Sequence, residues 1–195
     1  YPIDQNNFHR IPSPKKSRRI SFIDGGNQPI MSTPSFSIHL IRVYFNIFQG
    51  DKRLNSTDMP EKLDFYSISV AKGGENINYV MRTIPADEKS EGYQPIKEKI
   101  SINSWDESLR TGHHRVDIDH LGNIARKFAE WKIAGLIAEK ELEEGDMIVC
   151  DGNLQSTVSN ESKFAQKAFE KAEKNGVIFS GLAKTSRIYT TTGNT

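Results

Sequence analysis

Residues 120–152 read HLGNIARKFAEWKIAGLIAEKELEEGDMIVCDG, and the spacing of apolar residues changes inside this stretch. Through residues 120–144 they recur at helical intervals, and a second apolar face predicts that this helix is buried. Gly145 suits the end of a helix. Residues 146–150 then predict a buried strand that runs into Asp151-Gly152.

A second helix and a further strand follow in the sequence. Ser159 or Asn160 can cap the start of the helix, and Gly176 comes after its end. Residues 177–183 then predict a strand. This rhythm of helix, strand, helix and strand is typical of a parallel sheet with crossover connections.

The front half of the chain has the alternating apolar pattern of strands instead. The predicted strands cover residues 20–23, 36–48, 65–71 and 78–84, with a short one over 99–102. The third and fourth flank a glycine-containing turn at residues 72–76, so they predict a hairpin. The predicted class is an α/β protein with a mixed sheet, in which a β-meander precedes helix-strand-helix-strand.

Composition limits the classes of function. The 195 residues suit one domain, and 26 Lys and Arg nearly cancel 25 Asp and Glu, so any basic surface must be local. A single cysteine excludes an internal disulfide and fits a reducing compartment, so we expect a cytoplasmic protein. The apolar stretches are shorter than the roughly 20 residues that span a bilayer, so we expect a soluble protein without a membrane partner.

Residues 1–19 contain prolines and a basic cluster, with few apolar residues to fix them in a core. We expect a flexible basic arm or linker here, before a domain over residues 20–195. The basic cluster has two readings, a solvated charge run or a contact for phosphates, and the first is the more usual.

Two predicted strands end in the same way, at Asp24-Gly25-Gly26 and at Asp151-Gly152-Asn153. In α/β sheets, ligands bind beyond the carboxyl ends of strands, and a glycine after an acid leaves room for them. If the two strands are neighbours, their carboxylates meet. The alternative is that each Asp-Gly pair is an ordinary turn.

Glu130 extends an apolar stripe of the first predicted helix, so its carboxylate needs a partner. Arg126 or Lys127 can supply an ordinary ion pair. The alternative partner is a divalent cation, because carboxylates and water are the oxygen ligands that Mg²⁺ and Mn²⁺ prefer.

Two other features of the sequence are interpreted as structural and not as part of a catalytic or metal site. Cys150 alternates with Asp151 along a strand, so we expect it to face away from the site as a small core residue. A cluster of imidazoles and carboxylates before the helix has no fixed metal-ligand spacing, and we interpret it as a solvated connection: His113, His114, Asp117, Asp119 and His120.

Four short motifs occur in order over residues 22–26, 129–132, 146–155 and 181–187. Together they resemble the motifs of the NurA family of DNA-repair nucleases. The resemblance implies an RNase H-like fold whose first Asp is on the opening strand, whose Glu is on a helix, and whose second Asp ends a strand beside the first.

The resemblance also implies a site and an activity. Asp24, Glu130 and Asp151 would hold one or two Mn²⁺ or Mg²⁺ ions and hydrolyse phosphodiesters. Lys184 and Arg187 lie just past a predicted strand, where their cations can hold a DNA phosphate or simply face solvent. The implied role is single-strand endonuclease and 5′-to-3′ exonuclease activity in DNA end resection and double-strand-break repair, by a homodimer coupled to a HerA-type hexameric ATPase.

The sequence departs from the family at several positions. Gly26 and Asn153 stand where the family commonly has Ser, and the chain stops at Thr195, before a stretch that supplies a Tyr and a His in the family. We therefore expect a nuclease domain truncated at its C-terminus. Two alternatives remain: a non-catalytic RNase H-like module that binds DNA or docks a HerA-type translocase, and an unrelated α/β domain whose acids form salt bridges.

Overall fold

The computed structural model describes residues 17–73, 76–109 and 112–183. Their eight strands are β1 (Arg19–Thr33), β2 (Phe36–Gln49), β3 (Lys52–Leu54), β4 (Lys62–Lys72), β5 (Asn78–Pro85), β6 (Ile100–Asn103), β7 (Met147–Asp151) and β8 (Ile178–Leu182). Their α-helices are α1 (Leu121–Lys140) and α2 (Glu161–Lys174), and two short 3₁₀ helices are η2 (Glu88–Ser90) and η3 (Ile118–His120). Lys184 and Arg187 lie outside the described residues, as do residues 1–16.

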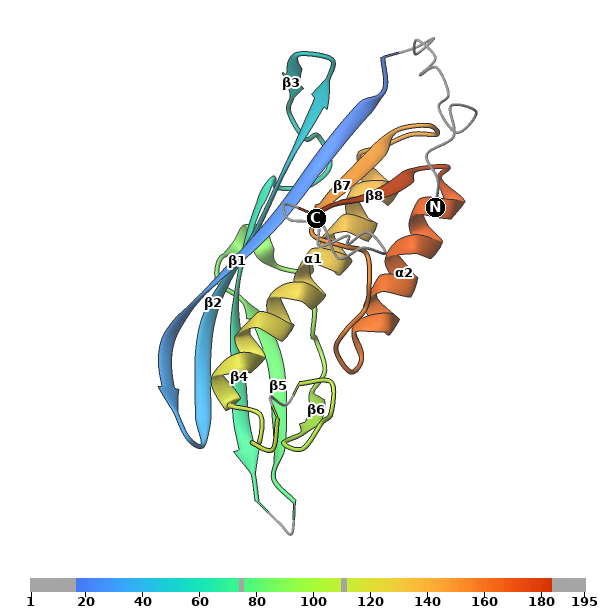
Figure 1. The fold of residues 1–195 in the computed structure, drawn as a ribbon. Helices are drawn as coiled ribbons and strands as arrows, with labels where there is room; N and C mark the ends of the chain where they lie inside the picture. The colour runs from blue at the N-terminus through green and yellow to red at the C-terminus, as the bar shows by residue number, and fades with distance from the viewer. Residues whose placement is uncertain (1–16, 74–75, 110–111, 184–195) are drawn as a thin grey trace, which may run out of the picture.

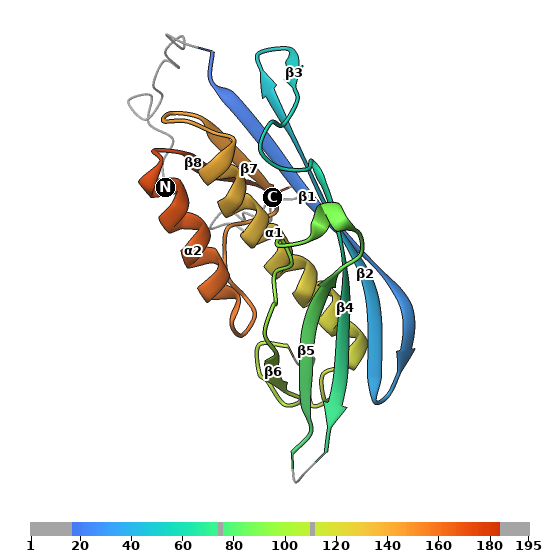
Figure 2. The same ribbon diagram turned by 180° about the vertical axis from the view of Figure 1, so that it is seen from behind.

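All eight strands form one mixed sheet in the order β6-β5-β4-β2-β1-β7-β8, with β3 paired to β2. The strands from β1 to β6 pair antiparallel, whereas β7 pairs parallel to β1 and β8 pairs parallel to β7. Helix α1 packs on β1 and β2, and α2 packs on α1, so both helices cover the same face (Figures 1 and 2). This confirms the predicted α/β class and the meander that precedes helix-strand-helix-strand.

Strand β1 is much longer than predicted. The expectation that it ends at Asp24 is wrong, because it continues through Gly25 and Gly26 to Thr33. Its whole length pairs with β2, up to Thr33 opposite Phe36. The parallel partner β7, in contrast, pairs with β1 only over its first residues. The glycines therefore lie where β1 loses one of its two neighbours, within the strand.

Helix α1 ends at Lys140, four residues before the predicted end at Glu144. The buried carboxylate of Glu141 accepts hydrogen bonds from the backbone N–H groups of Thr57, Asp58 and Met59, at 2.9 to 3.1 Å, and from the Ser56 hydroxyl. The chain leaves the helix at this anchor, which ties the end of α1 to the loop between β3 and β4.

The core lies between the sheet and α1, and α1 meets α2 at very short range. Phe128 and Phe164 stack across the two helices with ring centroids 4.4 Å apart. At Gly135, a β-carbon would lie 2.9 Å from the Cα of Ala168, so the two backbones approach as closely as glycine allows. The distance between the helices is therefore set by backbone contact.

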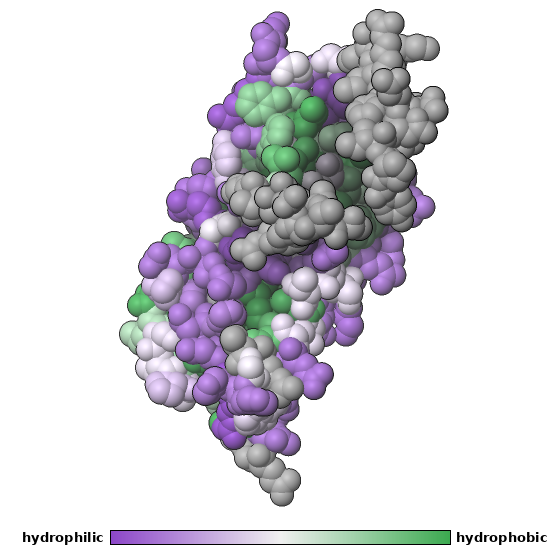
Figure 3. All heavy atoms as spheres, viewed as in Figure 1, coloured by the Kyte–Doolittle hydropathy of each residue, from purple (hydrophilic) through white to green (hydrophobic). Residues whose placement is uncertain are grey.

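The opposite face of the sheet carries no helix among the described residues, and several of its apolar side chains are exposed. Phe22, Tyr44 and Leu182 are 42%, 37% and 60% exposed. A space-filling view shows hydrophobic residues gathered over the upper part of the molecule and a mostly hydrophilic surface below (Figure 3). In the described part of the chain, neither helix combines the length and apolarity needed to cross a membrane.

Glu141→Gln is expected to lower the free energy of unfolding by about 2 kcal/mol at pH 7, because hydrogen bonds to a charged acceptor are lost from a buried site. Burial alone would raise the pKa of Glu141, but the hydrogen bonds from Ser56, Thr57, Asp58 and Met59 hold it below its ordinary value of 4.5. The contribution is therefore fully present above pH 4.5 and is lost as pH falls through the lowered pKa. Urea unfolding at several pH values measures both effects.

The matched control is Glu143→Gln, because the Glu143 side chain is 85% exposed in the same loop. Its expected cost is below about 0.5 kcal/mol. Equal losses in the two variants would contradict an anchoring role for Glu141.

Candidate functional site

Asp24 and Asp151 lie side by side on neighbouring strands. The parallel pairing of β1 and β7 extends to Ile23 opposite Cys150, and each aspartate is the next residue of its strand. Both line one cavity, together with Phe22, Tyr44, Asn46 and Leu182. The prediction that these strands are neighbours is confirmed, and Asp24 is not in a turn.

Strand alternation determines where Asp24 points. Ser21 and Ile23 are buried on the face that the helices cover, whereas Phe22 and Asp24 are exposed on the other face. The Asp24 carboxylate accepts a hydrogen bond from the backbone N–H of Gly25 at 2.8 Å. This bond holds the carboxylate at the point where β7 leaves β1.

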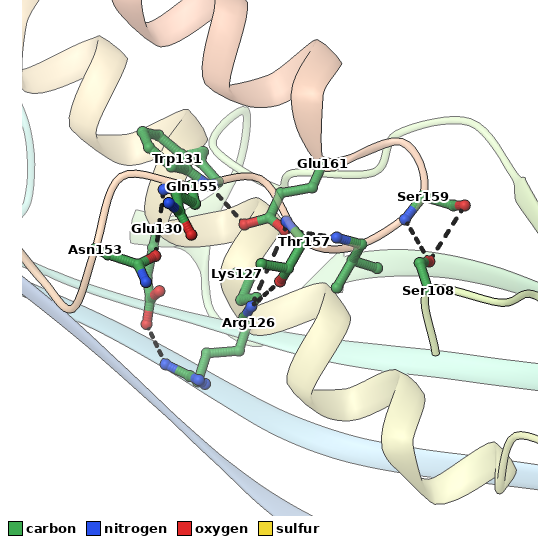
Figure 4. Close-up of polar contacts among 11 residues, drawn as sticks. Ser108, Arg126, Lys127, Glu130, Trp131, Asn153, Gln155, Thr157, Ser159 and Glu161 are labelled. Atoms are coloured by element: carbon green, nitrogen blue, oxygen red, sulfur yellow. Dashed lines mark hydrogen bonds and ion pairs between the residues drawn. The ribbon is translucent and has the colours of Figure 1, made fainter. Parts of the chain in front are cut away.

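Glu130 approaches the next residue of β1 from α1, on the face that the helices cover, and lies above the backbone of Gly25. A β-carbon built at Gly25 would lie 2.5 Å from the Oε1 atom of Glu130, so this approach requires glycine. Arg126, one helical turn earlier, forms an ion pair with the same oxygen at 2.5 Å and donates to the carbonyl of Gly25 at 3.2 Å. Figure 4 shows Arg126 and Glu130 pointing toward one another from α1.

The charge of Glu130 is strongly perturbed. Burial raises its pKa to about 7, Arg126 opposes the rise, and the negative charges of Asp24 and Asp151 add to it. Glu130 is therefore close enough to both aspartates for their charges to act on it. The sequence allowed two kinds of partner for Glu130, a basic side chain or a divalent cation, and the ion pair with Arg126 is the first of these.

Cys150 alternates with Asp151 and packs against the core as predicted, but it also lines the cavity that contains Glu130, so it faces away from only part of the site. Burial, followed by the charge of Glu130, raises the pKa of the Cys150 thiol to about 12. The thiol does alternate with Asp151, but the face of β7 that it occupies is the one beneath α1. It packs at the edge of the core as a neutral group.

A second cavity lies on the helix side of the sheet edge. Its walls include Arg126, Lys127, Glu130, Asp151, Asn153, Gln155 and Glu161. Asp151 and Cys150 line this cavity and also the one that contains Asp24. Asp151 therefore connects the two cavities, with Asp24 on one side and Glu130 on the other.

The loop after β7 is held over this second cavity by Glu161. The carboxylate of Glu161 is buried and accepts hydrogen bonds from the indole of Trp131 at 3.0 Å and from the backbone N–H groups of Thr157 and Val158 (Figure 4). Lys127 donates to the hydroxyl of Thr157 at 3.1 Å. The loop therefore has fixed contacts with both helices, although Asn160 makes no capping bond with its side chain.

The oxygen atoms of Asp24, Glu130 and Asp151 are the donor class that Mg²⁺ and Mn²⁺ prefer. Within residues 17–73, 76–109 and 112–183, no three His, Cys, Asp or Glu side chains are already gathered as a metal cage. Repulsion between Glu130 and the two aspartates is the kind of interaction that a bound cation relieves. By the chemistry of their oxygen donors the three residues suit a divalent cation, and Arg126 neutralises Glu130 in this structure.

The interpretation of the imidazole cluster as a solvated connection needs one correction. Asp119 Oδ1 lies 3.0 Å from the Nε2 atom of His39, a residue of β2 that is only 2% exposed. Gly122 covers the ring, since a β-carbon there would lie 2.3 Å from Nδ1. Sequence analysis missed His39, although it occupies the buried face in the alternation of β2.

No protein-family model matches the chain, and no curated protein or solved structure matches it.

In a metal-free buffer, we expect the pKa of Glu130 to make the protein less stable as pH rises. Between its ordinary value of 4.5 and about 7, the folded state holds a proton that the unfolded state releases. The Glu130→Gln side chain does not titrate, so the variant does not lose stability in this way. The unfolding free energy of the variant minus that of the native protein should therefore rise by about 3 kcal/mol from pH 4 to pH 8. Urea unfolding with a chelator present measures the difference.

Glu139→Gln is the control, because Glu139 is exposed on the same helix. Its stability relative to the native protein should not change over the same pH range. A flat profile for Glu130→Gln would mean that Glu130 is charged throughout and that its burial costs little.

Proposed function

We propose that the protein is a metal-dependent nuclease that hydrolyses phosphodiester bonds of DNA at Asp24, Glu130 and Asp151. One observation carries the proposal: Glu130 of α1 lies over Gly25, where the pairing of β1 with β7 ends, and its charge interacts with those of Asp24 on β1 and Asp151 on β7. Residues far apart in the sequence rarely bring like charges together unless a cation or a substrate uses them.

We further infer an RNase H-like fold. The meander of β1, β2 and β4 is followed by α1, β7, α2 and β8, and β7 lies beside β1. The placement of the acids supports this inference, because the first is on the opening strand, the second on a helix and the third at the end of the neighbouring strand. The resemblance to the NurA family implies the same arrangement.

The residues around the acids have definite tasks in this proposal. When bound, Mn²⁺ or Mg²⁺ would polarise the phosphodiester and activate a water molecule. Arg126 restrains the Glu130 carboxylate beside Gly25. Arg126 and Lys127 line the cavity beside Asp151, where their charges can attract a phosphate.

The more detailed role rests on the family resemblance alone. It comprises single-strand endonuclease and 5′-to-3′ exonuclease activity in DNA end resection and double-strand-break repair. A homodimer, a HerA-type hexameric ATPase as partner, and DNA contacts by Lys184 and Arg187 belong to the same proposal.

The second candidate function is a non-catalytic module of the same fold that binds DNA or docks a HerA-type translocase. The ion pair between Arg126 and Glu130 favours it, because an arginine already neutralises one of the three acids. Titration calorimetry with Mn²⁺ separates the two candidates. The nuclease binds the ion, whereas a folded protein that shows no binding at millimolar concentration is the module.

Asp24→Asn and Asp151→Asn should each slow Mn²⁺-dependent cleavage of labelled single-stranded DNA at least about a hundredfold, since each removes a charged oxygen ligand. Circular dichroism should show an unchanged fold, because both side chains are exposed. Asp51→Asn, at an exposed turn after β2, is the matched control and should cleave like the native protein. Cleavage retained by both site variants would defeat the assignment.

Gly25→Ala is expected to reduce cleavage at least about tenfold, because its methyl group would occupy the position of the Glu130 carboxylate. Gly26→Ala provides a control on the adjacent residue, since a β-carbon there meets no atom within 4 Å. Initial rates at saturating Mn²⁺ compare the two variants. Equal rates would show that the position of Glu130 over Gly25 is irrelevant to the chemistry.

A further inference from the structure

A groove rich in lysine lies between α1, α2 and residues 95–100. It consists of two adjoining cavities that share Pro95, Phe164 and Lys167. Six lysines and one carboxylate, Glu98, line it; the lysines are Lys97, Lys99, Lys132, Lys163, Lys167 and Lys171. We call this surface the lysine groove. The chain as a whole has a net charge of only +1, so the groove concentrates positive charge.

One wall of the lysine groove is a row of like charges on α2. Lys163, Lys167 and Lys171 are four residues apart, which places them on one face of the helix at steps of about 6 Å. Like charges at this spacing destabilise a helix by about 0.2–0.5 kcal/mol per pair. Among the described residues, Lys171 is the one groove lysine in an ion pair, with Glu139. The row is therefore costly to the fold unless an anion lies against it.

The floor of the lysine groove holds a recessed lysine. Lys132 is half-buried on α1 and its Nζ donates to the carbonyl of Gln94 at 2.7 Å. Burial, followed by the charges of Lys97, Lys171 and Lys167, lowers the pKa of Lys132 to about 8. Lysines from three segments therefore lie close to Lys132, and an anion bound there would interact with several of them at once.

We propose that the lysine groove binds the sugar-phosphate backbone of single-stranded nucleic acid. A row of cations at regular spacing suits a chain of phosphates. A groove suits a strand better than a flat lipid surface, since its lysines lie on separate walls and not in one plane. Trp131 lines both this groove and the cavity that contains Glu130 and Asp151, so the groove lies next to the acidic site.

This inference deepens the proposed function, on which it rests for the identity of the nucleic acid as DNA. The binding contact itself needs no metal, because it consists of lysines and phosphates. It can therefore be measured with a chelator present, under conditions in which no metal-dependent cleavage occurs.

The test measures fluorescence anisotropy of a labelled single-stranded DNA of about 20 nucleotides with the full chain in EDTA. The triple variant Lys97→Gln, Lys163→Gln, Lys167→Gln should bind at least about tenfold more weakly at 0.1 M salt. The slope of log affinity against log salt should fall in magnitude by about 2, since each lost phosphate contact on a single strand removes about 0.7. Circular dichroism checks that the variant is folded.

The matched control is Lys52→Gln, Lys72→Gln, Lys174→Gln, which removes the same charge from exposed positions outside the groove. It should bind within about twofold of the native protein. Equal losses in the two triples would reduce the effect to net charge and overturn the proposal. Binding to anionic vesicles but not to DNA would overturn it too.

Cleavage assays distinguish failure of the groove from failure of the nuclease. In Mn²⁺, the groove triple should show a raised KM with kcat restored at saturating DNA, whereas Asp24→Asn should lose kcat. Weak DNA binding by the groove triple together with undiminished cleavage by Asp24→Asn would support the groove and reject the acidic site. The reverse pattern would reject the groove alone.

Discussion

The approach of the Glu130 carboxylate to the backbone of Gly25 is the constraint on which the candidate site depends. It brings α1 close to β1 where β7 ends, so that Glu130 lies near Asp24 and Asp151. A larger residue at position 25 would hold the helix away, and the three charges would no longer interact. Arg126 stabilises this arrangement, because its guanidinium forms an ion pair with the Glu130 carboxylate and donates a hydrogen bond to the carbonyl of Gly25.

The architecture was predictable wherever local spacing and tertiary packing agree. The change of period at α1, the alternation in β2 and the hairpin of β4 and β5 each specify one element with little help from the rest of the chain. The errors lie where distant contacts override local signals. Gly25 and Gly26 suggest a break, but pairing with β2 keeps them extended, and Glu141 ends α1 because a loop more than 80 residues earlier donates to it.

The gathering of the acids was predictable only in part. Parallel pairing brings Asp24 and Asp151 together, which their position after apolar strands indicated. The face of each side chain was not predictable, because it depends on how β1 and β7 lie beneath α1. Cys150 shows this, since alternation gave its relation to Asp151 but not its position facing Glu130. The spacing of Lys163, Lys167 and Lys171 is visible in the sequence, but the groove is not, because its walls come from three separate segments.

The contact between Gly135 and Ala168 has a consequence for the groove above it. Because the two helices touch through backbone atoms, α2 cannot move closer to α1, and the row of lysines on α2 keeps a set separation from Lys132 on α1. Such a surface is organised before any ligand arrives. Association then requires little rearrangement of the two helices, and in the protein the ordering falls mainly on the exposed lysine side chains.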